Sequence, residues 1–106
     1  MAHRLSEDER RDTVQLTRDL ISIPSTARDG DEIYRFALDF LVERGLDARF
    51  QSMRSPHLEY QDHSNLVVRL GDGDGSGPRI MLNGHLDTVA AGEGWYHDPY
   101  SGHEDG

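Results

Sequence analysis

Two hydrophobic patterns follow one another along the chain, the first with the period of a helix and the second with that of a strand. Five apolar residues recur at i, i+3, i+4, i+7 and i+8, one face of a helix: Ile33, Phe36, Ala37, Phe40 and Leu41. Gly45 then predicts a left-handed C-cap, with Leu46 packing back onto the last turn.

An earlier helix is predicted from its start signal. Ser6-Glu7-Asp8-Glu9 matches the capping box, in which Ser6 and Glu9 satisfy each other's backbone donors. A rough apolar stripe follows, made of Val14, Leu16, Leu20 and Ile21. Pro24 ends this helix and begins a loop.

Strand patterns take over after Gly45. Residues 47–53 alternate weakly, 65–70 are β-branched, and 80–82 are apolar on both faces, as in a central strand. The eight residues "GDGDGSGP" are too few for a crossover helix, so the last two strands are expected to pair as an antiparallel hairpin. The sequence thus predicts an incomplete α/β domain over residues 1–106, with two helices followed by strands of a mixed sheet.

Charge and composition narrow the classes of function. The net charge of −9 disfavours nucleic acid as a partner. The chain has no cysteine, no apolar signal segment and no stretch of membrane-spanning length, so a cytoplasmic protein without membrane contact is expected. All eleven basic residues are arginine, which fits either a high-salt cytoplasm or GC-rich codon usage.

Candidate chemistry lies at His85 and Asp87, which follow the apolar run at 80–82. Side chains two residues apart in an extended segment point the same way. A metal-bound imidazole usually gives its other N–H to a carboxylate, so this pair suits one corner of a metal site. The residues alone leave two alternatives open, half of a metal site or a polar strand end, since a catalytic zinc needs about three protein ligands.

The longer string resembles one family of zinc metallopeptidases, that of acetylornithine deacetylase, succinyl-diaminopimelate desuccinylase, aminoacylase and carboxypeptidase G. Its members typically read G-H-x-D-T-V-P, then Trp, Asp-Pro-Phe and Asp-Gly. This chain has "LNGHLDTV", then Trp95, Asp98-Pro99 and Asp105-Gly106, and "LTRDLISIPS" resembles the family's opening helix. Ala90 in place of proline and Tyr100 in place of phenylalanine depart mildly from the pattern.

The resemblance implies that His85 ligates one of two zinc ions, or cobalt in their place, and that Asp87 orients its ring in the catalytic site. It also implies an N-terminal fragment of a catalytic domain, inactive alone, because the family's Asp-Met-Lys-Gly and Glu-Glu motifs are absent. The smaller domain used for dimer contacts is absent too, so a homodimer is expected of the full-length enzyme. The implied reaction is metal-assisted hydrolysis of an amide in an N-acyl amino acid or short peptide, with a glutamate as general base.

Two rival functions stay open beside this one. A related zinc aminopeptidase also has His-x-Asp after a strand, although the Thr-Val continuation and the Trp and Asp-Pro segment favour the first family. The second rival function is that of a standalone domain that is not an enzyme.

Two further patterns in the sequence are interpreted without a function. His97 and His103 could form a local metal cluster with His85 and Glu104, but His97 and His103 lie outside the matched motif, and no metal cluster is expected there. The "GDGDGSG" run lacks the pattern of a phosphate or calcium loop and is interpreted as a hairpin tip.

Trp95 is expected to serve either as a substrate contact or as a packing anchor of its loop.

Overall fold

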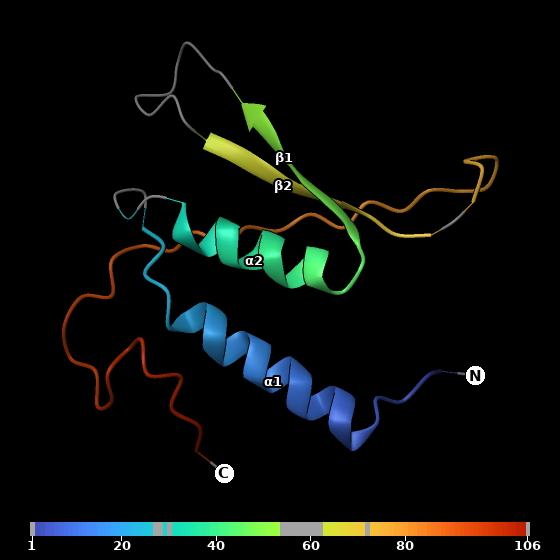
Figure 1. The fold of residues 1–106 in the computed structure, drawn as a ribbon. Helices are drawn as coiled ribbons and strands as arrows, with labels where there is room; N and C mark the ends of the chain where they lie inside the picture. Colours follow the sequence, from blue (N-terminus) through green and yellow to red (C-terminus); the bar gives the residue numbers. More distant parts are fainter. Residues whose placement is uncertain (1, 27–28, 30, 54–62, 72, 106) are drawn as a thin grey trace. The chain divides into compact units, whose positions relative to one another are not determined.

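The computed structural model describes residues 2–26, 29, 31–53, 63–71 and 73–105. The elements are, in chain order, α1 (Glu7–Ile21), α2 (Glu32–Glu43), β1 (Asp47–Met53) and β2 (His63–Arg69), as drawn in Figure 1. Contacts divide the chain into two compact units, Met1–Ile33 with Asp87–Gly106 and Tyr34–Leu86. The predicted α/β order of two helices followed by strands is confirmed.

Helix α1 begins with the predicted capping box. The backbone N–H of Glu9 donates to Ser6 Oγ at 3.1 Å, and the backbone N–H of Ser6 donates to Glu9 Oε2 at 2.7 Å. Three acidic residues in the first turn, Glu7, Asp8 and Glu9, complement the positive end of the helix dipole. No residue of α1 is fully buried, and its apolar stripe leaves Val14 and Ile21 about two-fifths exposed.

Helix α2 ends as its sequence predicts. Gly45 adopts φ +75°, its N–H donates to the carbonyl of Val42 at 2.9 Å, and the N–H of Leu46 donates to the carbonyl of Leu41 at 3.1 Å. These two bonds are those of a Schellman motif, which satisfies carbonyls that the helix leaves unpaired. Neither α1 nor α2 has the length and apolar character needed to cross a membrane.

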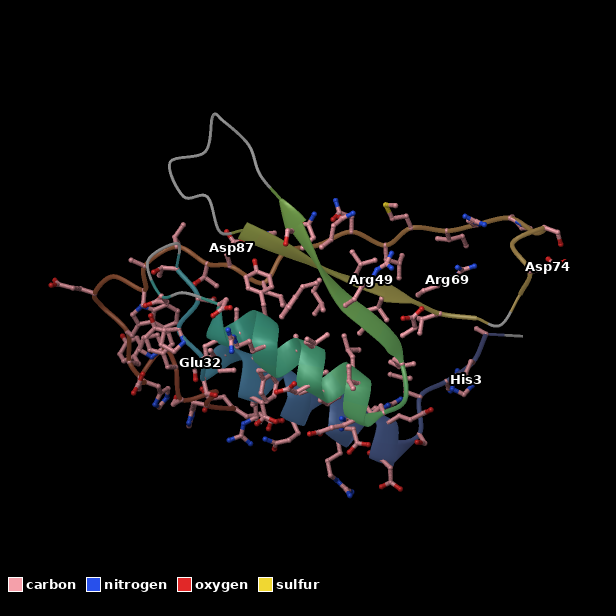
Figure 2. All side chains as sticks on the ribbon, turned by 45° about the horizontal axis from the view of Figure 1, so that its top comes forward. His3, Glu32, Arg49, Arg69, Asp74 and Asp87 are labelled. Carbon is pink, nitrogen blue, oxygen red and sulfur yellow. The ribbon has the colours of Figure 1, made fainter. Side chains whose placement is uncertain are left out.

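Strands β1 and β2 pair antiparallel, with Asp47 opposite Arg69 and Phe50 opposite Leu66. One face carries polar side chains, including Asp47 and the two arginines labelled in Figure 2, Arg49 and Arg69. The other face carries Ala48, Phe50, Leu66 and Val68. This alternation is typical of an antiparallel sheet with one apolar face.

The predicted hairpin between residues 65–70 and the run at 80–82 is wrong. The partner of β2 is β1, and residues 78–86 form no strand, as the orange trace beyond β2 in Figure 1 shows. Ile80, Met81 and Leu82 are about nine-tenths exposed, so they are not a covered central strand in this chain. The connection also departs from extended backbone, since Gly71 and Gly75 both have positive φ.

A local turn stands where the hairpin tip was expected. The backbone N–H of Ser76 donates to Asp74 Oδ1 at 2.9 Å, which is an Asx-turn. Hydrogen bonds from the Ser76 side chain and then from its backbone lower the pKa of Asp74 below its ordinary value of 3.8. The turn therefore stabilises the charged carboxylate.

Substitution Ser6→Ala tests the capping box. Removing Oγ leaves the N–H of Glu9 without its acceptor, and we expect α1 to lose about 1 kcal/mol of stability. The measurement is helix content by circular dichroism during thermal unfolding. Ser6→Asp keeps an acceptor and should retain the original curve; a Ser6→Ala curve identical to it would show that the box does not stabilise α1.

Substitution Ser76→Ala tests the Asx-turn through pH. Because the pKa of Asp74 is lowered in the turn, the stabilisation is present above the ordinary pKa of 3.8 and is lost as pH falls through the lowered pKa. We expect Ser76→Ala to raise the pKa of Asp74 toward 3.8, measured by NMR titration of its carboxyl carbon. Ser52→Ala on β1 is the control and should leave that pKa unchanged; an equal pKa in all three proteins would contradict the turn.

Candidate functional site

His85 and Asp87 lie in an irregular segment, and both side chains are exposed. Neither follows a strand in the described residues, so the expected position at the carboxyl end of a strand is wrong for this chain. The boundary between the two compact units falls between Leu86 and Asp87, which assigns His85 to one unit and Asp87 to the other. Their predicted roles as metal ligand and orienting carboxylate stay predictions.

The residue after Asp87 is held by hydrogen bonds within its own unit. The backbone N–H of Thr88 donates to the carbonyl of Ser25 at 3.0 Å, and Ser25 Oγ donates to Thr88 Oγ1 at 3.5 Å. Ser25 is buried, with 5% of its surface exposed. The loop that follows α1 therefore fixes the start of the Asp87–Gly106 segment, a contact between residues far apart in sequence that pattern reasoning did not find.

Trp95 forms a hydrogen bond within the loop that follows Thr88. Its indole N–H donates to the carbonyl of Ala91 at 2.7 Å, while 60% of the residue is exposed. The hydrogen bond fits the predicted role of an anchor for its loop.

A compact turn follows at the Asp-Pro-Tyr motif. The backbone N–H of Tyr100 donates to Asp98 Oδ1 at 2.9 Å, and the backbone N–H of Ser101 donates to the carbonyl of Asp98 at 3.0 Å. Ser101 Oγ donates to the same carbonyl at 2.7 Å and accepts from the backbone N–H of His103 at 3.2 Å. Asp98 and Ser101 thus close the turn with hydrogen bonds, and Ser101 also holds the backbone of His103.

This turn brings together three side chains that can bind a metal: His97, His103 and Asp105. The two imidazole rings stack with centroids 3.6 Å apart, and His103 Nε2 lies 2.8 Å from Asp105 Oδ1. One donor atom from each residue lies within 4.8 Å of the others. We name this group the histidine–aspartate cluster. All three side chains are exposed.

The cluster differs from the grouping that was considered, and disfavoured, from the sequence alone. His97 and His103 do come together, but with Asp105 and without His85 or Glu104. The missed signal is the turn formed by Asp98 and Pro99, which folds the chain back between the two histidines.

Comparison with known proteins finds relatives over most of the chain. A succinyl-diaminopimelate desuccinylase of Methylobacterium radiotolerans is 37% identical over 92 residues, which are 84% of this chain and 22% of the relative. The protein of the same name from Acidiphilium cryptum is 38% identical over 90 residues, and that from Ehrlichia ruminantium 31% over 96. No family model and no solved structure matches the chain.

The relatives are succinyl-diaminopimelate desuccinylases by name. The chain belongs to the family of acetylornithine deacetylase, succinyl-diaminopimelate desuccinylase, aminoacylase and carboxypeptidase G. It spans about a fifth of the length of the curated relatives that it matches, 22% in the first two.

Proposed function

We propose that this chain supplies one corner of the active site of a zinc-dependent amidohydrolase that cleaves N-acyl amino acids. The observation that carries the proposal is the identity of 37% to a desuccinylase over 84% of the chain. The Gly84-His85-x-Asp87-Thr88 motif lies in this chain at the position where the family resemblance expects a metal ligand. N-succinyl amino acids are the favoured substrates because the matched relatives are desuccinylases by name.

The donor types at this motif fit zinc. An imidazole is an ordinary zinc donor, a carboxylate is the usual acceptor for its second N–H, and both groups are exposed at His85 and Asp87. A catalytic zinc generally needs about three protein ligands, so one histidine does not complete a site. We therefore infer that the other ligands, and the general base, come from residues outside this chain.

Each residue of the motif has a separate role in the proposal. His85 binds metal through one ring nitrogen, and Asp87 accepts the N–H of the other, which fixes the tautomer of the ring and raises its basicity. Bound zinc supplies a Lewis acid and lowers the pKa of a coordinated water. The hydrogen bond from the backbone N–H of Thr88 to the carbonyl of Ser25 holds the backbone directly after Asp87. This bond restricts the backbone position of the residue that carries the carboxylate.

Substitutions in the protein encoded by the complete reading frame test these roles. We expect His85→Ala to abolish hydrolysis and to lower the zinc content of the protein, and Asp87→Asn to lower activity or metal affinity by about 10- to 100-fold. Zinc content by mass spectrometry is measured beside kcat/KM on N-succinyl and N-acetyl amino acids and a dipeptide. His3→Ala, at an exposed histidine paired with Glu9, is the control and should be unchanged.

The outcomes separate the candidate functions. Full activity and zinc content in His85→Ala would refute the proposed ligand. Hydrolysis confined to the dipeptide would favour the aminopeptidase instead. We also expect the coding sequence after Gly106 to contain Asp-Met-Lys-Gly and then Glu-Glu; a reading frame without them would favour a standalone domain without catalysis.

A further inference from the structure

We propose that His97, His103 and Asp105 form a second metal site, separate from His85, that takes a divalent transition metal such as zinc. Two imidazoles and a carboxylate are a donor set that suits zinc, copper and nickel. All three residues belong to the same compact unit, and their donor atoms already lie within 4.8 Å of one another.

The backbone around the histidine–aspartate cluster explains why the donors meet. His97 and His103 flank the turn that Asp98 and Ser101 close with hydrogen bonds of 2.7 to 3.0 Å. Ser101 Oγ also accepts from the backbone N–H of His103 at 3.2 Å, so the second histidine is held to the turn. The site is thus formed by local structure over nine residues, from His97 to Asp105.

Gly102 sets the direction in which the chain leaves this turn. Its φ is +63°, a conformation that a residue with a Cβ rarely adopts. A Cβ at this position would lie 3.1 Å from the Cβ of Arg18 on α1, which belongs to the same unit. Glycine therefore lets the segment that carries His103 and Asp105 pass close to α1.

Binding requires a small rearrangement of side chains. Donors around one tetrahedral zinc lie about 3.4 Å apart, given metal–ligand distances of about 2.1 Å. The pair His103 Nε2 and Asp105 Oδ1, 2.8 Å apart, would open slightly, and the widest pair would close from at most 4.8 Å. An imidazole binds through a lone pair in its ring plane, so at least one of the stacked rings must turn. Both are exposed, and rotamer changes of exposed side chains take picoseconds to nanoseconds.

Three protein donors leave a coordination position for water or another small ligand. All three donors of the cluster belong to residues 97–105, so metal binding there does not require the further ligands that complete the site at His85. We therefore expect the 106-residue chain to bind one zinc ion.

Calorimetric titration of the chain with zinc chloride is the test, together with NMR of its isotope-labelled histidine rings. We expect His97→Ala and His103→Ala each to weaken binding by about tenfold or more, and Asp105→Asn, which keeps the shape of the side chain, to weaken it by about tenfold. The ring resonances of His97 and His103 should shift with zinc. His3→Ala is the matched control, since His3 is also exposed and lies 3.6 Å from a carboxylate of Glu9 but belongs to no group of three metal donors among the described residues.

The variants distinguish this site from the one proposed at His85. Binding that survives His97→Ala and His103→Ala, or no binding by the chain, would overturn the second site. Loss of binding in His85→Ala alone would also overturn it and would support the ligand of the proposed enzyme. Helix content by circular dichroism accompanies each variant; weakened zinc binding with unchanged helix content supports the cluster.

Discussion

A β-strand must find hydrogen-bond partners for its backbone N–H and C=O groups. This requirement decides which of the extended, apolar segments of the chain become strands. β1 and β2 satisfy each other along one edge, from the pair Asp47 and Arg69 to the pair Met53 and His63. The run Ile80 to Leu82 is more apolar than either strand, yet it forms no strand and is about nine-tenths exposed. Hydrophobic character alone therefore does not make a strand; a paired neighbour is needed as well.

The sequence predicted the positions of both helices and of β1 and β2, and it predicted in most detail the features that are determined within a few residues. The capping box at Ser6 and the Schellman motif at Gly45 each depend on contacts over three to five positions, and both are present as predicted. Strand pairing is a contact between distant residues, and the choice of β1 over 80–82 as the partner of β2 was not readable from the hydrophobic pattern. The link between Ser25 and Thr88 was missed for the same reason.

The candidate sites show the same division between local and distant contacts. His85 and Asp87 could be predicted as site residues because their motif is continuous in sequence, and the relatives support the family that the motif indicated. The histidine–aspartate cluster was missed in part because residue type alone could not tell Asp105 from Glu104. What selects Asp105 is the conformation of the turn after Asp98, including the positive φ of Gly102.

The two candidate metal sites differ in the conformational entropy that binding must overcome. The cluster closes a loop of only nine residues that hydrogen bonds already hold in a turn, so little further ordering is required. A site at His85 must gather its remaining donors from distant residues, and the fold of the larger protein has to supply that ordering before metal binds. Because loop closure costs more for longer separations, a metal added to this chain alone should prefer the donors around His97 and His103, although the family motif lies at His85.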